Sequence, residues 1–484
     1  METPFFPALR ARLAACGQRS LQTVRQWTLA QLGQQLRDLL PAHLLAAEDE
    51  GPHSRHRDYP LGLTLQCFLW QILQFNTSCR EVIRQVQTLY RLAGQGTVDE
   101  DNSAYVQARQ RLPLERMTGL LTATASAADA RAGAAGSLQS RPVKVADGSS
   151  AQAPDTRANR KRFPQPVTQK PGCGFPVVRF VALFSLASGA ILDVVWDTVS
   201  HHDLRLFQRL WECLRRGDIF LGDRAFGDYL TLAALPKRGV DVVARVHHRR
   251  RIDFRKTKRL GRQDGLTVWK KALRCPPFLD AAQWDQMPAQ ITVRLIRFTA
   301  TIRGQRGRRI TLVTTLLDPE LYPAHELIAL YARRWRLELC FRDLKTTLGM
   351  EMLHCKTPAM LEKELLAFFV AHNLIRCVMA EAAGLHDAPL ERISFKGTLD
   401  ALRQFSNAIA QARNQKMRRQ LWADLLLTLA RDLVPDRPGR QEPRALKRRL
   451  KCYPLLTKPR HRYREIPHRN KYSKGKRRNL RALN

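Results

Sequence analysis

The sequence predicts an α/β protein in which an all-helical region precedes a mixed sheet flanked by helices, and a β-rich insertion interrupts the sheet domain. Three observations support this prediction. Apolar residues recur at helical intervals through the first 135 residues. Short apolar or alternating runs then follow one another from residue 143. Long helical patterns return from residue 325.

The helical region is expected to cover residues 1–135. Helical spacing of apolar residues is clear over Pro7–Leu40 and again over Leu61–Leu92. A stretch rich in Ala and Gly, Ala123–Ser137, ends the region, and the composition changes after it. We therefore place a domain boundary near residue 135.

Five strands are expected in the sheet domain, which covers residues 136–434. They are predicted at Val143–Asp147, Val177–Leu186, Ile191–Val199, Ile219–Asp223 and Val240–Val246. Gly189 supplies a hairpin turn between the second strand and the third. A helix over Asp203–Arg215 precedes the fourth strand.

The β-rich insertion is expected at about residues 247–310, after the fifth strand. It begins with a basic segment, residues 247–262, which contains eight Lys or Arg and a single acid, Asp253. Further strands are predicted at Leu266–Trp269, Ile291–Ile302 and Arg309–Leu317, with Gly304 and Gly307 in a turn.

Three helices are expected after the insertion, at His325–Gly349, Leu361–Ala383 and Thr398–Leu433. The second of them is the most apolar stretch of the chain. His372, Asn373 and Arg376 interrupt it, so we expect a buried helix and no membrane association.

The net charge of +38 implies a polyanionic partner, because phosphates would relieve self-repulsion of this size. Residues 436–484 contribute +15 of this charge, so residues 435–484 are expected to form a basic C-terminal tail. The rest of the chain is still strongly basic, and nucleic acid is the leading candidate. An alternative role for the tail is solubility alone.

Ten cysteines are spread along the chain without a CxxC or CxC pair, which argues against a zinc ribbon or a disulfide framework. The N-terminal residues lack an apolar segment followed by a small-residue cleavage site. A cytoplasmic protein with reduced thiols is expected.

Four polar residues are spaced so that they share one face of the helix predicted at His325–Gly349. Tyr331, Arg334, Glu338 and Lys345 would lie within about 60° of one another at roughly 100° per residue. An adjoining apolar stripe would dock the helix on the core; it consists of Leu330, Leu337, Phe341, Leu344 and Leu348. A carboxylate between cations and a phenol suits a site for phosphates and a metal ion. A solvated charged helix face is the alternative.

Two aspartates are expected near strand ends that neighbour each other. The element order, a three-stranded meander followed by a helix, two more strands and a closing helix, is that of an RNase H-like domain. Asp147 ends the first predicted strand and Asp223 ends the fourth, and Glu338 could complete a triad. Three such carboxylates can hold two divalent ions about 3.5 to 4 Å apart, and Mg²⁺ or Mn²⁺ fits their oxygen ligands. Each aspartate alone could instead make an Asx turn or a helix cap.

These motifs resemble those of the DDE transposases of the insertion-sequence-four family. The YxxRxxxExxxxxxK spacing from Tyr331 to Lys345 is similar to the family's YREK signature. The segment from Asp147 to Ser150 resembles its first aspartate motif, and the segment from Gly222 to Phe226 resembles its second. The likeness covers residues 135–380 well and the helical region more loosely.

The resemblance implies a cut-and-paste DNA transposase with a helical DNA-binding domain and an RNase H-like catalytic domain. Asp147, Asp223 and Glu338 would be catalytic and would bind two Mg²⁺ ions. The DNA-binding residues would be Tyr331, Arg334, Lys345, Arg224 and Trp269. Trp269 would stack on a flipped base, although a core position in the insertion is an equal alternative.

The resemblance also implies the partners: double-stranded DNA, as transposon terminal inverted repeats and target, and a second copy of the chain in a homodimeric synaptic complex. The expected location is the bacterial cytoplasm, in association with the nucleoid. Two alternatives stay open. One is a DNA-binding relative that has lost catalysis, and the other is an RNase H-like nuclease without strand transfer.

Overall fold

The structure is a computed structural model, and it describes residues 42–45, 58–74, 77–92, 98–133, 136–247, 249–276, 279, 281–300, 308–435 and 455–463. The helix predicted over residues 7–40, the turn at Gly304 and Gly307 and most of the basic tail lie outside these residues.

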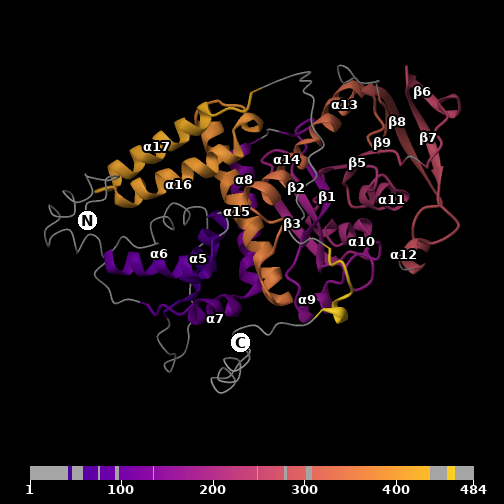
Figure 1. The fold of residues 1–484 in the computed structure, drawn as a ribbon. Coiled ribbons are helices and arrows are strands. Elements are labelled where there is room, and N and C mark those ends of the chain that lie inside the picture. Colours follow the sequence, from indigo (N-terminus) through magenta and orange to yellow (C-terminus); the bar gives the residue numbers. More distant parts are fainter. Residues whose placement is uncertain are drawn as a thin grey trace.

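A nine-stranded mixed sheet forms the centre of the molecule, in the order β3-β2-β1-β4-β5-β9-β8-β7-β6 (Figure 1). The strands are β1 (Val143–Gln152), β2 (Val177–Ser185), β3 (Ile191–Thr198), β4 (Ile219–Gly222), β5 (Asp241–Arg245), β6 (Lys258–Gly261), β7 (Asp264–Lys270), β8 (Gln290–Ala300) and β9 (Arg308–Thr314). Strands β1, β4 and β5 are mutually parallel, whereas β2 and β3 run antiparallel to their neighbours. This is the RNase H-like arrangement, and it confirms the predicted fold class.

The insertion continues the same sheet. Its last strand, β9, pairs antiparallel with β5, and β8, β7 and β6 follow in turn. The three predicted insertion strands are present. The fourth, β6, lies inside the basic segment, where closely spaced Lys and Arg leave no apolar alternation that would indicate a strand.

Helices cover both faces of the RNase H-like part of the sheet. Alternate residues of β2 belong to two different cores, because Phe180 and Phe184 point to one face and Val181 and Leu183 to the other. The first core includes α8 (Leu114–Ala132) and α15 (Pro358–Leu385). The second includes α10 (Asp203–Gln208) and α11 (Tyr229–Lys237). Burial of both faces explains why the strands read as nearly continuous apolar runs.

Five short elements complete the described part of the sheet domain: α9 (Arg157–Arg162), α12 (Ala281–Asp285) and three 3₁₀ turns, Trp211–Cys213, Phe254–Lys256 and Leu390–Arg392. The predicted helix over Asp203–Arg215 is therefore divided into α10 and the first 3₁₀ turn. Helices α9 and α11 are not among the elements predicted from the sequence. The side chain of Asp228 starts α11 by accepting a hydrogen bond from the backbone N–H of Thr231.

Helix α15 is the buried helix that the sequence predicts. It is apolar and long enough to cross a membrane, but 89% of its most apolar window is buried inside the protein. The side chain of Asn373 joins three elements, because it accepts from the backbone N–H of Ile191 on β3 and donates to the backbone oxygen of Leu121 on α8. Helix α8, which precedes the predicted boundary near residue 135, thus shares the core of the sheet.

The other described N-terminal helices are α4 (Ala42–Leu45), α5 (Leu61–Leu73), α6 (Cys79–Leu92) and α7 (Ser103–Arg111). A small core around the ring pair Tyr59 and Tyr105 holds α5, α6 and α7 together. The helical pattern over Leu61–Leu92 is thus divided in two, and Ser78 caps the second helix by accepting from the backbone N–H of Glu81.

Two antiparallel helices, α16 (Phe395–Gln411) and α17 (Gln415–Arg431), replace the single helix predicted at Thr398–Leu433. Asn414 interrupts the pattern, because its side chain accepts from the backbone N–H of Met417 and starts α17. Residues 455–463 return to the sheet domain beside α9 (Figure 1). There the guanidinium of Arg460 binds the carboxylate of Asp155 through both oxygens.

Candidate active site

The first two acids lie at the same level on neighbouring parallel strands. Val145 of β1 is opposite Leu221 of β4, so Asp147 and Asp223 each follow that pair by two residues. The prediction that Asp147 ends its strand is wrong: β1 continues to Gln152 because β2 pairs with it along this whole length. Strand β4 ends at Gly222, one residue before the predicted end at Asp223. Asp147 and Asp223 therefore lie just beyond the last paired residues of β1 and β4.

Asp223 makes an Asx turn, whereas Asp147 lies inside the paired strand β1 and binds the N–H of the residue directly after it. The Oδ1 atom of Asp147 accepts from the backbone N–H of Gly148 at 2.8 Å. The Oδ1 atom of Asp223 accepts from the backbone N–H of Ala225 at 2.6 Å. These contacts fix one oxygen of each carboxylate and are compatible with a second role for the other oxygen.

The helix that carries the four-residue strip is not uniform. It consists of α13 (Ala324–Arg333), α14 (Arg336–Arg342) and a π-helical segment, Asp343–Thr347. Backbone bonds to the third preceding residue tighten the junction between α13 and α14, at Trp335, Leu337 and Glu338. The predicted apolar stripe is buried along its whole length. The prediction of a single regular helix is therefore wrong. The four polar residues depart from their ideal α-helical positions because tight 3₁₀-type turns are followed by wider π-helical turns.

Arg334 lies between the first acid and the third. Its guanidinium is 3.9 Å from Asp147 Oδ2 and 3.8 Å from Glu338 Oε1. The Arg334 side chain is 12% exposed, whereas that of Glu338 is 46% exposed. The structure therefore brings Asp147, Arg334 and Glu338 together through one largely buried cation.

Tyr331 lies beside this group. The Arg334 guanidinium is 5.8 Å from the centre of the Tyr331 ring, and the phenol is buried. Burial raises the pKa of Tyr331, while Arg334 and Arg245 oppose this shift and Asp223 adds to it. Tyr331 is thus within electrostatic reach of Asp223 and links the helix to β4 and β5.

The Asp147 carboxyl lies in an environment that disfavours its negative charge. Burial raises its pKa to about 6, and the charges of Asp223 and Asp203 add to this shift. The N–H of Gly148 and the guanidinium of Arg334 oppose it without cancelling it. A cation placed against Asp147 and Asp223 would relieve this unfavourable energy.

The donor set suits a divalent ion, although the three acids do not yet surround one point. Among the described residues no three His, Cys, Asp or Glu side chains are close enough to hold a metal ion together. Arg334 occupies the space between Asp147 and Glu338 and provides the positive charge there. The carboxylate oxygens are nevertheless the ligands that Mg²⁺ and Mn²⁺ prefer, so the residues fit such an ion once Arg334 has moved.

A fourth acid, which sequence reasoning missed, supports the Asp147 strand. Asp203, the first residue of α10, accepts hydrogen bonds from two nitrogens of Arg179 on β2. The Asp203 carboxylate lies against Gly148, where an added Cβ would come within 2.9 Å of it. A glycine directly after Asp147 was the available signal, because close packing beside a strand often requires the absence of a side chain.

The remaining predicted DNA-binding residues lie in different surroundings. Lys345 is half-buried in the π-helical segment. Trp269 is 4% exposed, and the guanidinium of Arg250 lies over its ring at 3.9 Å. This position is that of a core tryptophan of the insertion, the alternative given above. Stacking on a base would require Arg250 to leave the ring.

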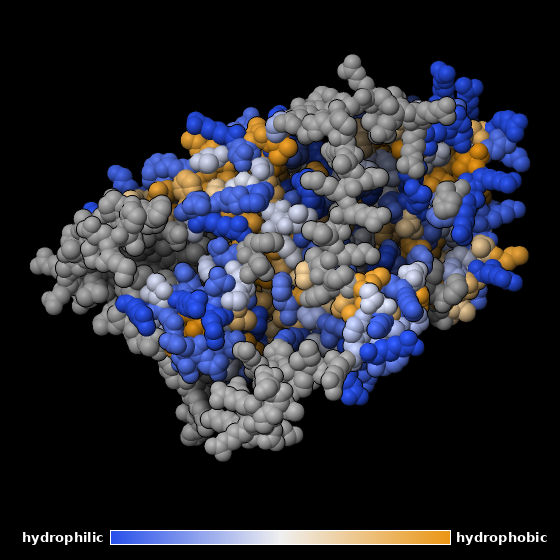
Figure 2. All heavy atoms as spheres, in the orientation of Figure 1, coloured by the Kyte–Doolittle hydropathy of each residue, from blue (hydrophilic) through white to orange (hydrophobic). Residues whose placement is uncertain are grey.

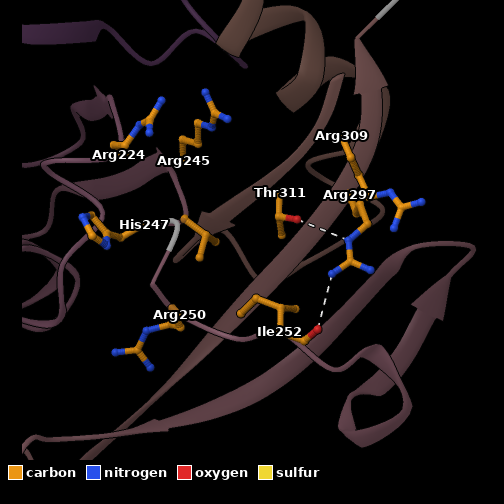
Figure 3. Close-up of a pocket in the computed structure, with 9 residues that line it drawn as sticks. Arg224, Arg245, His247, Arg250, Ile252, Arg297, Arg309 and Thr311 are labelled. Atoms are coloured by element: carbon orange, nitrogen blue, oxygen red, sulfur yellow. Dashed lines mark hydrogen bonds between the residues drawn. The ribbon is translucent and has the colours of Figure 1, made fainter. Parts of the chain in front are cut away.

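Arg224 lines a pocket next to Asp223, at the junction of the RNase H-like strands and the insertion (Figure 3). On the surface, hydrophilic side chains project from the edge formed by β6, β7 and β8 (Figure 2). The exposed basic residues of this edge include Arg255, Lys258, Arg259 and Arg262. Positive charge thus extends from the candidate site across the insertion.

Comparisons with known proteins agree with this geometry. The family model described as "Transposase DDE domain" matches residues 138–374, which contain all three acids. Transposase InsG for insertion sequence element IS4, from Escherichia coli (strain K12), is 24% identical over 407 residues, which cover 84% of this chain and 89% of that protein. A solved piggyBac transposase synaptic complex with hairpin DNA overlaps 87% of each chain at 8% identity. Its TM-score of 0.39 is too low to support an argument.

Proposed function

We infer that this chain is a DDE transposase related to the insertion-sequence-four family, and from this premise we propose that it catalyses cut-and-paste transposition of an insertion sequence. The observation that supports the proposal most is the position of Asp147 and Asp223 on adjoining parallel strands, with Glu338 facing them from the closing helix through Arg334. Three carboxylates from these elements are what phosphodiester hydrolysis assisted by two metal ions requires.

We assign Asp147, Asp223 and Glu338 as the catalytic residues and as the ligands of Mg²⁺ or Mn²⁺, with two ions expected. When bound, such ions activate water for attack on a phosphodiester and stabilise the oxygens that carry negative charge. Asp147 and Asp223 are positioned by neighbouring strands, so they need little rearrangement. Glu338, which is about half exposed, would turn away from Arg334 to join them.

Arg334 couples DNA binding to the assembly of this site. In the free protein it lies near two of the three acids. A DNA phosphate offers the guanidinium a bidentate partner, and its transfer to that phosphate would release Asp147 and Glu338 for the metal ions. Tyr331 would donate a hydrogen bond from its phenol O–H to the same backbone, and Lys345 would neutralise a neighbouring phosphate.

The proposed substrates are the terminal inverted repeats of a transposon and a target duplex. Two ends must be joined, so a homodimer is the proposed synaptic unit. The net charge of +38 supports DNA as the partner. We place the protein in the bacterial cytoplasm with the nucleoid. The proposed reaction first frees a 3′-hydroxyl at the element's end, and this hydroxyl then attacks the second strand or the target.

The test uses a plasmid that carries the gene with its flanking DNA, purified full-length protein and Mg²⁺. The wild type is expected to excise the element and insert it elsewhere, whereas Asp147→Asn, Asp223→Asn and Glu338→Gln each lose cleavage by more than about 10³-fold and still bind DNA. Cleavage without insertion would favour a nuclease, and no cleavage by the wild type would favour a DNA-binding relative. Undiminished cutting by one variant would remove that residue from the site.

A further inference from the structure

Five arginines line one pocket of about 240 Å³ at the junction of the RNase H-like strands and the insertion (Figure 3). Arg224 follows β4, Arg245 ends β5, and Arg250 belongs to the segment after β5. Arg297 comes from β8 and Arg309 from β9. His247, Val246, Ile252 and Thr311 complete the lining, which contains no Asp or Glu. The described part of the chain thus concentrates positive charge here without an acid in the wall.

Two of these arginines are held in place by their own contacts. The guanidinium of Arg297 donates to Thr311 Oγ1 at 3.3 Å and lies over the Phe254 ring at 4.3 Å. That of Arg250 is stacked on Trp269. Aromatic stacking leaves the in-plane N–H groups able to bind an anion. The pocket is therefore preorganised, with less side-chain entropy to lose when a ligand enters.

The pocket is electrostatically unfavourable without an anion. Among the described residues, no ion pair joins Arg224, Arg250, Arg297 or Arg309 to a carboxylate. Burial lowers the pKa of Arg250, and burial together with the charge of Arg309 lowers that of Arg297. An oxyanion would offset this repulsion and would form charge-assisted hydrogen bonds with several guanidiniums.

The ligand must be compact, because a pocket of this size cannot admit a duplex. A terminal phosphomonoester carries about −1.5 to −2 charges and three strong acceptor oxygens. An internal phosphodiester carries one charge, and its strand must leave the pocket on both sides. The number of arginines that line the pocket fits the higher charge of the terminal group better.

The reaction proposed above creates such a group beside the pocket. Water bonds through its oxygen to phosphorus, the bond from phosphorus to the 3′ oxygen breaks, and that oxygen takes a proton. The products are a 3′-hydroxyl and a 5′-phosphate. Arg224 directly follows Asp223, and Arg245 lies within electrostatic reach of Tyr331, so the pocket adjoins the site of cleavage.

We propose that this arginine pocket is a binding site for the 5′-phosphate of a cleaved DNA strand. The assignment rests on the proposed function for the origin of that strand end. Its chemistry can be tested without catalysis, because strand ends bind whether or not the protein produced them. Occupation would retain the cut strand next to the acids until the 3′-hydroxyl has reacted.

The experiment measures binding of the full-length protein to fluorescent single strands of about ten nucleotides and unrelated sequence, in EDTA. One strand carries a 5′-phosphate, one a 5′-hydroxyl and one a 3′-phosphate. The wild type is expected to prefer the 5′-phosphate over the 5′-hydroxyl by about tenfold and to show little gain from the 3′-phosphate.

Arg309→Gln is the test variant, because this arginine is exposed at the pocket and its replacement leaves the core intact. It should reduce the preference to about threefold or less. Arg262→Gln, an exposed arginine of the insertion outside the pocket, is the matched control and should keep the preference. Thermal unfolding of each variant checks that the fold is retained.

Three results would overturn the assignment: equal affinity of the wild type for 5′-phosphate and 5′-hydroxyl, an equal gain from the 3′-phosphate, or equal losses in the two variants. These results are independent of cleavage. If the wild type cuts DNA but does not prefer a 5′-phosphate over a 5′-hydroxyl, only the pocket assignment is wrong. If it has this preference but does not cut DNA, only the proposed transposase reaction is wrong.

Discussion

At the scale of a single residue, the raised pKa of Asp147 predicts how the free energy of unfolding depends on pH. Its folded value of about 6 lies above the ordinary 3.8, so folding favours the protonated form. The penalty is absent below about pH 4, grows between pH 4 and 6 and is complete above pH 6. Asp147→Asn should therefore raise the free energy of unfolding at pH 8 by about 1 to 3 kcal/mol and leave it nearly unchanged at pH 4.

Denaturant unfolding at both pH values measures this difference. Mg²⁺ provides a second comparison, since it should stabilise the wild type at pH 8 more than the Asn variant. An equal gain for Asp147→Asn at both pH values would show that the carboxyl is not held in an unfavourable environment.

A side chain added at Gly148 is expected to lower the rate of DNA cleavage because it would displace Asp203. A Cβ at this position would come within 2.9 Å of the Asp203 carboxylate and displace it from Arg179. Gly148→Ala should shift Asp147 and lower the rate of DNA cleavage by about 10²-fold, with DNA affinity retained. Gly384→Ala, in α15, is the control, because its Cβ meets nothing closer than 3.8 Å. Normal cleavage by Gly148→Ala would separate Asp203 from the positioning of the site.

At the scale of elements, α15 anchors the chain that follows the site helix. The buried carboxylate of Glu364 accepts from the backbone N–H groups of His354 and Cys355, at 2.9 Å in each case. Glu364→Ala leaves the buried N–H of Cys355 and the partly buried N–H of His354 unpaired, so it should lower the free energy of unfolding by about 2 to 3 kcal/mol. Glu362→Ala on the same helix should have an effect below about 1 kcal/mol. Urea unfolding compares the two, and equal losses would contradict the anchoring role.

The order and faces of the elements could be predicted because apolar periodicity records burial. The stripe from Leu330 to Leu348 and the runs at β1 to β5 have this signal. Apolar periodicity does not indicate where a side chain caps a helix by binding a nearby backbone N–H group. The apolar pattern therefore predicts one helix where the Asn414 cap separates α16 from α17. It likewise predicts one regular helix where a π-helical segment, Asp343–Thr347, changes the backbone geometry.

The apolar runs predict that Asp147 and Asp223 lie level with each other on neighbouring strands, and the structure has this arrangement, although Asp147 lies inside β1 and not at its end. The partners of the acids could not be predicted, because contacts such as Arg179 with Asp203 join residues that are distant in sequence. The arginine pocket is a similar case. Its residues come from three strands and from the segments that follow β4 and β5, and only the nine-stranded sheet brings them together.

At the scale of the whole molecule, the charge of +38 predicts how DNA binding responds to salt. Removal of residues 436–484, which carry +15, should weaken binding to unrelated duplexes and flatten the plot of log affinity against log salt concentration. Affinity measured from about 50 to 200 mM salt gives both slopes. Equal slopes would show that this segment does not contact phosphate.

A control isolates the docked part of that segment. Arg460 binds Asp155 and also donates to the backbone oxygen of Gly172. Arg460→Ala should detach residues 455–463 from the sheet domain while it removes only one charge. A salt slope that falls as far in Arg460→Ala as in the truncated protein would mean that docking, and not the number of charges, controls binding.

The pairing of β9 with β5 limits how the insertion can change during evolution. Loss of the insertion would leave β5 as a bare edge strand, open to pairing with another chain and to aggregation. The present edge, β6, is short and rich in Lys and Arg, which discourages such pairing. The insertion can therefore vary in sequence far more readily than it can be deleted.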